Sequence, residues 1–433
     1  MTELNTKPRT RNLHAWLDYI ERIHPCDIEM NLDRLNQVKS NLNYPLSFPI
    51  ISVSGTNGKG SVCSILESIL SCAGYLVGCY TSPHLLRHNE RIRIGEKEVS
   101  DNELCEAFNI IETARVASNV QLTYFEFSTL AAMELITKAR VDVAILEVGL
   151  GGRLDAVNIF DAECSILTNV DYDHKEYLGD TREKIGLEKA GIFRRGKAAI
   201  CADISPPISI QQHALFIGAE LKVIGDHFNY SRESYTWSYC EGRHSYYSLP
   251  YSSLGNAPHQ LNNASACLAT LNVLKDILPV TVNNIRSGLL NIQLPGRFQI
   301  LSDEPRVILD VAHNPSAIHA LNTRLSKMTH HQETYGIFSV MKDKDIGGMA
   351  QILDSEIDIW LVAGINSSRG ASSSEVVEIL ENAGIRKILT FPDPAAAYIF
   401  ACKQATINDR ICVFGSFYVV GRIMEFLNQE KFG

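Results

Sequence analysis

Long apolar runs are absent from this sequence: none of its uninterrupted apolar stretches is long enough to span a bilayer. Residues 1–12 are polar and lack the apolar core of a secretory signal peptide. No Cys-x-x-Cys pair occurs among the eleven cysteines, which argues against a zinc site and against a disulfide framework. We therefore expect a cytoplasmic protein without a membrane partner.

A surplus of basic residues is also absent. Acidic residues number 49 and Lys plus Arg 40, which gives a formal net charge of −9. Such a charge argues against nucleic acid or an anionic membrane as a general partner. Internal repeats and low-complexity tracts are missing as well. With 433 residues, of which 45% are apolar and 21% charged, the chain is typical of a globular protein of two domains.

β-type apolar runs alternate with helical patterns, which favours an α/β fold with a doubly wound sheet of parallel type. In the first half, short buried strands are predicted at 77–80, 141–148, 164–170 and 198–201. Between about 221 and 251, Tyr, Trp, Ser and His alternate without a helical period, which predicts a β-rich patch. A helix is predicted over 260–274.

A Pro-Gly pair within Leu294-Pro295-Gly296-Arg297 marks the expected joint between the two domains. Beyond it a second α/β series begins, with strands predicted at 307–311, 335–340, 359–363, 387–390 and 411–414. We therefore expect an N-terminal domain of residues 1–295 and a smaller C-terminal α/β domain of residues 296–433.

The most informative stretch begins with a short apolar run that ends in a glycine-rich turn and a helix. The turn contains Thr56, Asn57, Gly58, Lys59, Gly60 and Ser61. Backbone N–H groups at a helix N-terminus, one lysine and one hydroxyl together form a phosphate cradle. The spacing departs from the usual phosphate-loop pattern, because Gly60 separates Lys59 from Ser61. A plain glycine-rich turn with a solvated lysine is the alternative.

Two further segments place polar groups at the expected ends of strands. Glu147 ends the apolar run 141–146, and a glycine-rich turn over 149–155 follows it. Ligands of α/β folds bind at this end of the strands, so Glu147 is a candidate Mg²⁺ ligand; a salt bridge is the alternative. Asp173-His174 follows another strand-like run, and His174 is either a ligand or a structural histidine.

Lys189 stands on the apolar face of a predicted helix. Asp180 and Glu183 are expected to form a capping box at its start. The apolar face has the spacing i, i+4, i+7 and i+8, occupied by Ile185, Lys189, Ile192 and Phe193. A desolvated lysine has a lowered pKa, and its neutral amine can react with CO₂ to give a carbamate that ligates Mg²⁺. The alternative is a lysine that extends from the helix flank to solvent.

In the second half, Asp310 and His313 come just after a predicted strand. Asp310 could accept hydrogen bonds from ribose hydroxyls, and His313 could face a transferred phosphoryl group. Asn263 and Arg297 could complete a nucleotide pocket.

Taken together, these motifs resemble the folylpolyglutamate synthase family, in its bacterial bifunctional form that is also a dihydrofolate synthase. They run in the family's order over nearly the whole chain: Ser54-Gly55-Thr56-Asn57-Gly58-Lys59-Gly60-Ser61, Thr81-Ser82-Pro83-His84-Leu85, Asn89-Glu90-Arg91-Ile92, Phe125-Glu126, Glu147-Val148-Gly149 with Gly152-Arg153-Leu154-Asp155-Ala156, Asp173-His174, Glu188-Lys189-Ala190-Gly191-Ile192, His259-Gln260, Asn263-Ala264, Leu294-Pro295-Gly296-Arg297 and Asp310-Val311-Ala312-His313-Asn314-Pro315.

The resemblance implies a Mur-ligase-like ATPase domain and a smaller C-terminal domain that close on ATP. It implies catalytic roles for Lys59, Glu147, His174, Lys189 and His313. Nucleotide binding falls to residues 56–61 with Asn263, Arg297 and Asp310. Ser61, Ser82, Glu147, His174 and a carbamylated Lys189 match ligands of Mg²⁺, in two sites. A substrate carboxylate would become an acyl phosphate, which the amine of L-glutamate attacks.

For the pterin substrate, the resemblance implies a site made by Glu29, Met30, Asn31, Thr123, Tyr124, Phe125, Glu126, Leu154, Asp155 and Ala156. The sequence departs from the family here, since the first segment is commonly Asp-Leu-Gly, Val157 replaces a threonine and Asn169 a small hydroxyl residue. The expected partners are ATP, L-glutamate, dihydropteroate and reduced folates, bound by a monomer. A monofunctional folylpolyglutamate synthase, a cell-wall Mur ligase and a non-catalytic nucleotide-binding module are the alternatives.

Overall fold

A computed structural model describes residues 11–26, 28–42, 44–251, 257–328, 331–367 and 369–432. The chain forms two compact units. Unit 1 comprises the described residues up to Ser82, His88–Val170 and Leu178–Ile292. Unit 2 comprises Gln293 onward together with two short segments from the first half of the chain, Pro83–Arg87 and Asp171–Tyr177.

Unit 1 is built on an eight-stranded sheet with the order β4-β3-β2-β5-β1-β6-β7-β8. Its strands are β1 (Ile50–Ser54), β2 (Val77–Tyr80), β3 (Ile92–Ile94), β4 (Lys97–Glu98), β5 (Val143–Glu147), β6 (Cys164–Leu167), β7 (Ala198–Cys201) and β8 (Glu220–Val223). From β2 to β8 all neighbours are parallel, and the edge strands β3 and β4 are antiparallel. The predicted parallel-type sheet and its four predicted strands are confirmed.

The helices of unit 1 connect these strands and cover them. They are α1 (Leu13–Ile20), α2 (Asp33–Ser40), α3 (Lys59–Cys72), α4 (Asp101–Ser118), α5 (Tyr124–Ala139), α7 (Arg182–Ala190), α8 (Ile208–Ile217), α9 (Pro258–Val273) and α10 (Val282–Asn291). Short 3-10 helices η1 (His88–Arg91) and η2 (Ala156–Ile159) lie between them, while the short helix α6 (Lys175–Leu178) begins in the segment Asp171–Tyr177 of unit 2. Helix α3 ends at Cys72, and Gly74 at φ +92° takes the left-handed conformation that closes the last turn.

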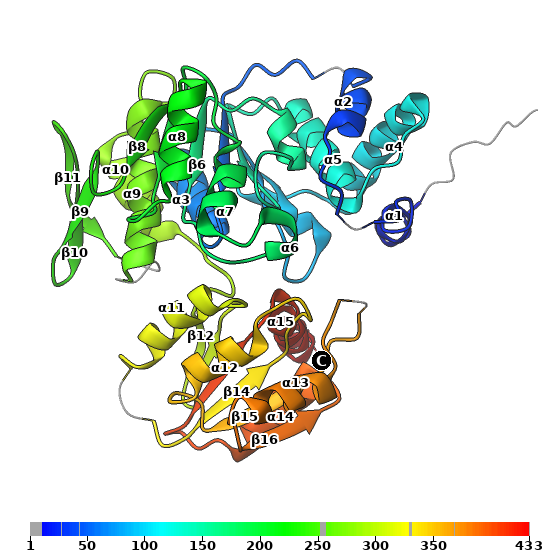
Figure 1. Ribbon diagram of the computed structural model, residues 1–433, viewed down its shortest axis with the longest axis vertical. Helices are drawn as coiled ribbons and strands as arrows, with labels where there is room; N and C mark the ends of the chain where they lie inside the picture. Colours follow the sequence, from blue (N-terminus) through cyan, green and yellow to red (C-terminus); the bar gives the residue numbers. More distant parts are fainter. Residues whose placement is uncertain are drawn as a thin grey trace, which may run out of the picture. The chain divides into compact units, whose positions relative to one another are not determined.

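A three-stranded antiparallel sheet lies beside α9 and α10 (Figure 1). It consists of β9 (Asn229–Arg232), β10 (Thr236–Glu241) and β11 (His244–Pro250), in the order β11-β10-β9. Trp237 and Tyr239 of β10 are fully buried. This sheet is the β-rich patch that the sequence predicts.

Unit 2 contains a six-stranded sheet with the order β12-β13-β17-β14-β15-β16. Its strands are β12 (Gln299–Asp303), β13 (Arg306–Leu309), β14 (Thr334–Phe338), β15 (Ile359–Ala363), β16 (Ile388–Phe391) and β17 (Arg410–Phe414). Only β12 runs antiparallel to its neighbour. Its helices are α11 (Pro315–Leu325), α12 (Ile346–Leu353), α13 (Ser373–Asn382), α14 (Pro394–Gln404) and α15 (Phe417–Phe432). The second predicted α/β series is confirmed.

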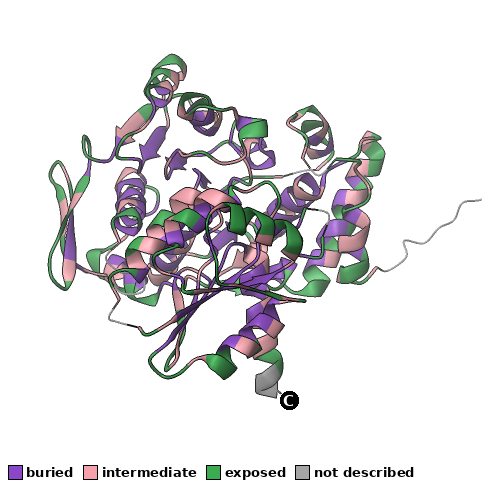
Figure 2. Ribbon diagram, turned by 60° about the horizontal axis from the view of Figure 1, so that its bottom comes forward, coloured by how far each residue is buried: buried purple, intermediate pink, exposed green. Residues whose placement is uncertain are grey.

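The four central strands of the unit 2 sheet, β13, β17, β14 and β15, are buried on both faces, as expected of parallel strands covered by helices, whereas the edge strands β12 and β16 are largely exposed. Side chains of successive residues point to opposite faces, so Phe338 belongs to one apolar cluster and Ile337 to the other. Phe338, Trp360 and Phe414 contact one another in the first cluster, with ring centroids 5.1–5.7 Å apart. Figure 2 shows the central strands in the colour of buried residues and the outer helix faces as exposed.

The start of α7 corrects one prediction. Its N-cap is Thr181, whose hydroxyl accepts the N–H of Lys184, so the predicted capping box of Asp180 and Glu183 is wrong. Asp180 instead pairs with the Lys184 side chain at 2.9 Å. Glu183 accepts the N–H groups of residues 208 and 209, because α8 packs against α7.

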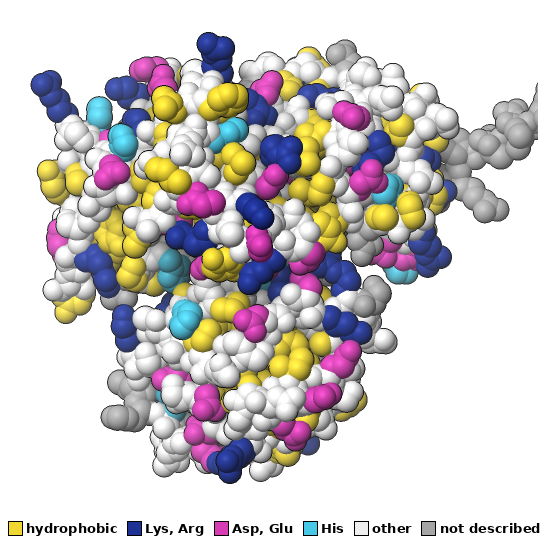
Figure 3. Space-filling model, in the orientation of Figure 1, with side chains coloured by type: hydrophobic (Ala, Val, Ile, Leu, Met, Phe, Trp, Pro, Cys, Tyr) yellow, Lys and Arg dark blue, Asp and Glu magenta, His cyan; other side chains and the backbone are white. Residues whose placement is uncertain are grey.

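In the described part of the chain, no helix combines the length and the apolarity that crossing a membrane requires. On the face that Figure 3 shows, basic and acidic side chains are interspersed. All eleven cysteines are free thiols. Burial raises the pKa of several of them, to about 12 for Cys164, Cys201 and Cys412.

Candidate active site

Three neighbouring strands of unit 1 end at the same edge of the sheet. In the parallel register, Val53 of β1 lies opposite Glu147 of β5, and Tyr80 of β2 lies opposite Leu146. The loop over 55–61, the Glu147 carboxylate and the Thr81-Ser82 segment therefore meet at the carboxyl ends of the strands, where α/β folds bind their ligands.

The glycine-rich loop needs its glycines for two separate reasons. Gly55 has φ +148°, and a Cβ there would lie 1.7 Å from the Thr168 hydroxyl. Gly58 has φ +86°, and its Cβ would lie 2.6 Å from Nδ2 of Asn263. The loop thus packs tightly against the end of β6 and against α9. Asn263, a candidate nucleotide ligand, lies directly on the loop.

Lys59 is the first residue of α3 and folds back over the loop. Its Nζ donates to the carbonyl oxygens of Gly55 and Thr56, at 3.1 and 3.4 Å. The N–H groups of Lys59, Gly60 and Ser61 lie in the first helical turn, where no intrahelical acceptor is available. These N–H groups are therefore available to donate hydrogen bonds to a phosphate.

Asn169 holds the loop from the side, a role that the sequence analysis did not assign to it. Its backbone oxygen accepts the Thr56 N–H and its side-chain oxygen accepts the Asn57 N–H, both at 2.9 Å. The Thr168 hydroxyl donates to the Asn57 oxygen at 2.7 Å. The departure from a small hydroxyl residue at 169 therefore affects the phosphate loop.

The residues at this edge supply an oxygen-rich set of candidate metal ligands. Glu147 is 5% exposed, and its Oε2 accepts the Ser82 N–H at 3.1 Å. Ser61, in the first turn of α3, is 2% exposed. Mg²⁺ prefers hard oxygen ligands such as a carboxylate and hydroxyls, so Ser61, Ser82 and Glu147 fit this ion.

The turn after Glu147 is tied to the phosphate loop and to α7. The Ser54 hydroxyl donates to the Gly151 oxygen at 2.7 Å. A Cβ on Gly152 would lie 2.7 Å from the Lys189 carbonyl oxygen, so α7 ends directly against the turn. Lys189 is only 4% exposed, which confirms its predicted place on the buried face.

Asp155 closes the same turn. Its two carboxylate oxygens accept the N–H groups of Leu150 and Val157, at 2.8 and 3.0 Å. Burial raises the pKa of Asp155 to about 6, against the opposing effect of these N–H groups and of Lys59. The carboxyl group is thus both a structural acceptor and a titratable group in the buried part of the site.

Two of the candidate pterin-binding residues approach this turn. The ring of Phe125 stacks on Tyr80 with centroids 6.0 Å apart, and a Cβ on Gly149 would lie 2.6 Å from it. The Met30 methyl lies 4.0 Å from the position of a Cβ on Gly151. Leu154 is half-buried beside Asp155, and Ala156 is buried.

The polar residues among the pterin-binding candidates form hydrogen bonds and ion pairs with other residues of the protein. Thr123 and Glu126 form a capping box at the start of α5, and Glu126 also accepts from Arg34 at 2.7 Å. Glu29 pairs with Arg34 and with His24, the latter at 2.9 Å. Remaining contacts join Asn31 to the Asp33 N–H at 2.7 Å and the Tyr124 hydroxyl to His88 at 2.6 Å.

In unit 2, Asp310 and His313 follow β13 as the sequence predicts. Asp310 accepts the N–H groups of Phe298 and Ala312, both at 2.8 Å. Burial raises the pKa of Asp310, although the nearby Arg297 lowers it. The Arg297 guanidinium lies 5.1 Å from the ring centre of Phe417.

His313 is held as a neutral imidazole. Its Nδ1 lies 2.8 Å from the Val311 oxygen, so the proton is on Nδ1 and the unshared pair on Nε2. Burial and the positive charge of Lys344 lower the pKa of His313 to about 4.

His174 belongs to unit 2, whereas the other candidate metal ligands belong to unit 1. It adopts the left-handed φ of +49°, and its ligand atom lies within 4.8 Å of those of Glu176 and Asp343. Lys344 pairs with Asp173 at 2.7 Å. Burial alone would raise the pKa of Asp173, but His174 and Lys344 hold it well below its usual range.

Comparison with known proteins identifies the family. Residues 53–271 match the Mur ligase middle domain, and residues 296–417 match the glutamate ligase domain of Mur ligases. The chain is 40% identical over 422 residues to the dihydrofolate synthase/folylpolyglutamate synthase of Escherichia coli strain K12, with 97% of each chain covered. The chain belongs to the dihydrofolate synthase/folylpolyglutamate synthase family.

Solved structures of this family have the same fold. Escherichia coli FolC in complex with DHPP and ADP matches with a TM-score of 0.92 and 39% identity, over 98% of this chain and 100% of that one. A bifunctional folylpolyglutamate synthase/dihydrofolate synthase with Mn, AMPPNP and L-glutamate bound matches with a TM-score of 0.89 and 40% identity, over 97% of this chain and 98% of that one. The family resemblance and fold class predicted from the sequence are confirmed.

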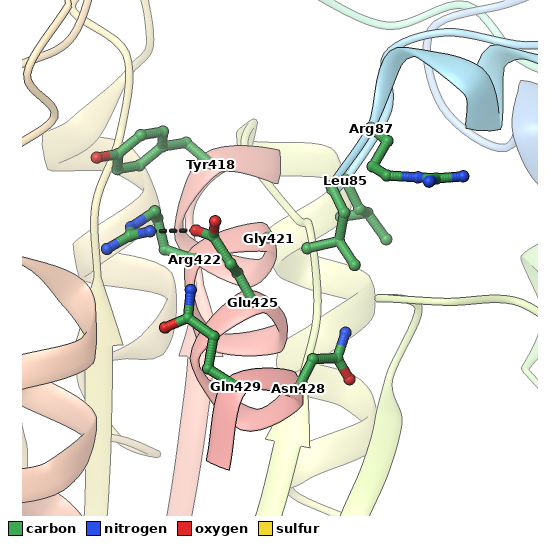
Figure 4. A pocket seen from close by; sticks show the side chains of 9 residues that line it. Leu85, Arg87, Tyr418, Gly421, Arg422, Glu425, Asn428 and Gln429 are labelled. Carbon is green, nitrogen blue, oxygen red and sulfur yellow. Dashed lines mark hydrogen bonds and ion pairs between the residues drawn. The ribbon is translucent and has the colours of Figure 1, made fainter. Parts of the chain in front are cut away.

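A pocket of about 570 Å³ in unit 2 is lined by none of the candidate catalytic, metal-binding, nucleotide-binding or pterin-binding residues. It lies between the segment Pro83–Arg87 and helix α15. In Figure 4, Arg422 and Glu425 are joined across one side of it, and Arg87 points away from the helix.

Proposed function

We propose that this chain is an ATP-dependent ligase that adds L-glutamate to dihydropteroate, giving dihydrofolate, and to reduced folates, giving folylpolyglutamates. The observation that carries the proposal is the position of the phosphate loop, residues 55–61, beside the buried Glu147 carboxylate at one sheet edge. The assignment of the substrates is supported by 40% identity to a dihydrofolate synthase/folylpolyglutamate synthase over 97% of the chain. The alternatives of a cell-wall ligase and a non-catalytic module are not favoured.

The phosphate groups of ATP are proposed to lie on the first turn of α3. The N–H groups of residues 59–61 donate to them, and Lys59 moves from its contacts with Gly55 and Thr56 to the outer phosphates. Asn263, in contact with the loop at Gly58, and Arg297 and Asp310 bind the rest of the nucleotide.

Ser61, Ser82, Glu147, His174 and a carbamate on Lys189 are proposed as the ligands of Mg²⁺, in two sites. When bound, the ion would offset negative charge on the phosphate oxygens. The buried position of Lys189 supports its carbamylation, because a desolvated amine loses its proton more readily.

The chemistry has two steps. A carboxylate oxygen of the pterin substrate attacks the γ-phosphorus, the bond to the β-phosphate oxygen breaks, and an acyl phosphate and ADP form. The α-amine of L-glutamate then attacks the acyl carbon, loses a proton, and phosphate leaves with the electrons of the broken C–O bond. Lys59 stabilises the negative charge that develops on the transferred group.

His313 is proposed to act where the phosphoryl group is transferred. Since Nδ1 donates to Val311, the Nε2 atom is left as a hydrogen-bond acceptor. A pKa of about 4 keeps the His313 imidazole uncharged at neutral pH, so Nε2 would accept a hydrogen bond at the transfer site and is too weak a base to hold the proton that the amine loses.

For the pterin, we propose a site around Phe125, Met30 and Asp155, which all approach the turn after Glu147. An aromatic face and a carboxyl group are suited to a flat heterocycle that carries N–H donors. Glu29, Asn31, Thr123, Tyr124, Glu126, Leu154 and Ala156 complete the proposed set.

The proposed working unit is a cytoplasmic monomer with an ATP- and pterin-binding domain of residues 1–295 and a glutamate-ligase domain of residues 296–433. Eleven free thiols, several of them deeply buried, support a reducing compartment.

The test is ADP release by the purified protein with ATP, Mg²⁺ and L-glutamate. Dihydropteroate is supplied in one reaction and tetrahydrofolate in the other. Release in both supports the bifunctional ligase. Release with tetrahydrofolate alone reduces the proposal to a monofunctional folylpolyglutamate synthase, and no release in either overturns it.

A further inference from the structure

Arg93, on strand β3, is in contact with four residues from three segments of unit 1: helix α3, the end of β2 and η1. Its Nε and Nη2 donate to the Glu67 carboxylate at 2.7–3.1 Å, and Nη2 also donates to the Cys79 sulfur at 3.2 Å. Its Nη1 donates to the Thr81 hydroxyl at 3.2 Å and to the Glu90 oxygen at 3.0 Å. The five N–H bonds of the guanidinium can all be satisfied by these four residues.

These contacts join the elements that carry the candidate metal ligands. Glu67 lies on α3, six residues after Ser61, and is 5% exposed. Thr81 directly precedes Ser82, whose N–H donates to Glu147. Arg93 therefore links the phosphate-loop helix to the segment that contacts the Glu147 carboxylate.

We propose that Arg93 is a positioning residue for the metal-binding edge of this enzyme. Its guanidinium holds the Thr81-Ser82 segment at a fixed distance from α3, so that Ser61, Ser82 and Glu147 present their oxygen atoms together. The proposal rests on the proposed function, because only a metal-dependent phosphoryl transfer gives this edge its role.

Only arginine can make these contacts simultaneously. A lysine has one ammonium group and can satisfy the Glu67 charge, but it cannot reach the Thr81 hydroxyl and the Glu90 oxygen from the same position. A buried ion pair adds little net stability over an apolar pair of similar shape. The planar geometry of Arg93 is therefore its main contribution here.

Arg93→Lys is the variant that separates charge from geometry. Mn²⁺ replaces Mg²⁺ as the probe, and the free ion is measured by electron paramagnetic resonance in the presence of a non-hydrolysable ATP analogue. We expect Mn²⁺ to bind about tenfold more weakly, as is typical when a residue that orients a ligand is changed. In the ligation assay, the Mg²⁺ concentration for half-activation should rise by a similar factor, with KM for dihydropteroate unchanged.

Arg115→Lys is the matched control. Arg115 also pairs with a glutamate, Glu112, at 2.8 Å and donates to a carbonyl oxygen, that of Val120, at 2.7 Å. It lies on α4, which packs mainly against α1, α2 and α5. Its replacement should lower thermal stability by about as much as Arg93→Lys and leave Mn²⁺ binding unchanged.

Thr81→Val tests whether Arg93 affects Mn²⁺ binding through the Thr81 hydroxyl. This substitution removes the hydroxyl that accepts from Arg93 and keeps the ion pair of Arg93 with Glu67. Thr81→Val alone is expected to weaken Mn²⁺ binding about tenfold, as Arg93→Lys does. If Arg93 acts through Thr81, the double variant binds Mn²⁺ no more than about twofold more weakly than Arg93→Lys. If the two residues act independently, the two tenfold losses multiply and the double variant binds Mn²⁺ about a hundredfold more weakly than the unaltered protein.

Unchanged Mn²⁺ binding in a folded Arg93→Lys variant would overturn the inference, and so would multiplying effects in the double variant. Absence of glutamate ligation by the unaltered protein would overturn the proposed function instead, so the two failures are distinguishable.

Discussion

The side-chain oxygen of Asn169 accepts the Asn57 N–H at 2.9 Å, and this contact fixes the phosphate loop to the end of β6. The same residue's backbone oxygen accepts the Thr56 N–H. A substitution at 169 would remove the first contact and keep the second.

We expect Asn169→Ala to raise KM for ATP three- to tenfold, with a small effect on kcat. A single hydrogen bond of this kind contributes about 1 kcal/mol, and the loop would spend less time in its binding conformation. Steady-state kinetics at saturating dihydropteroate measure the change. Asn169→Ser, which restores the hydroxyl common in the family, should recover part of the loss; an unchanged KM in Asn169→Ala would mean that the loop needs no such support.

Lys59→Ala is expected to abolish glutamate addition to both dihydropteroate and tetrahydrofolate. Both reactions pass through phosphoryl transfer, and Lys59 is the cation that the loop provides for it. ADP release is the measurement, and melting temperature shows whether the variant is folded. Lys184→Ala is a suitable control, because the Lys184 ammonium group forms an exposed pair with Asp180 and the substitution keeps the backbone N–H that Thr181 accepts. Normal turnover of either substrate by Lys59→Ala would contradict the mechanism.

His313 should titrate near pH 4 in the folded protein. Nuclear magnetic resonance of histidine labelled with ¹³C measures this, and His313→Gln identifies the resonance. The folded-state pKa of about 4 lies below the unfolded value near 6.5, so unfolding takes up a proton in this range. The free energy of unfolding of unit 2 should therefore fall as pH decreases from about 6.5 to 4. A midpoint close to 6.5 would show that His313 is not held neutral.

Lys189 should form a carbamate when the protein is exposed to CO₂. With ¹³C-bicarbonate, we expect one carbamate resonance that is lost in Lys189→Arg, because a guanidinium stays protonated and does not react. Acidification releases the carbamate, so the signal should disappear at low pH. A spectrum without this resonance at neutral pH would leave Lys189 as a buried amine.

Much of the fold could be predicted because its signals are local. Short apolar runs predicted the central strands of the two large sheets, and the order of Gly58, Lys59 and Ser61 predicted the loop, whereas the edge strands β3, β4, β8 and β12 were not predicted because few of their residues are apolar and buried. The start of α7 was mispredicted because Thr181 competes with Asp180 for the N-cap, and either residue suits that position.

Other features depend on contacts between distant residues. Nothing local marks Arg93 as a partner of Glu67 and Thr81, because the pairing requires β3 to run antiparallel to β2. Asp343 and Lys344 lie in a loop after β14 and reach Asp173 and His174 only through the fold. Likewise, the segments Pro83–Arg87 and Asp171–Tyr177 belong to unit 2 although the sequence around them forms unit 1.

Because most of the free thiols are not exposed, mass spectrometry after thiol labelling can distinguish the folded chain from the unfolded chain. Cys26, Cys240 and Cys402 are the exposed ones among the eleven. A brief pulse of maleimide should therefore add three labels to the native chain and up to eleven to the unfolded chain. Because Cys63 and Cys79 lie in unit 1 and Cys412 in unit 2, peptide mapping of the labels would report on the opening of each unit separately.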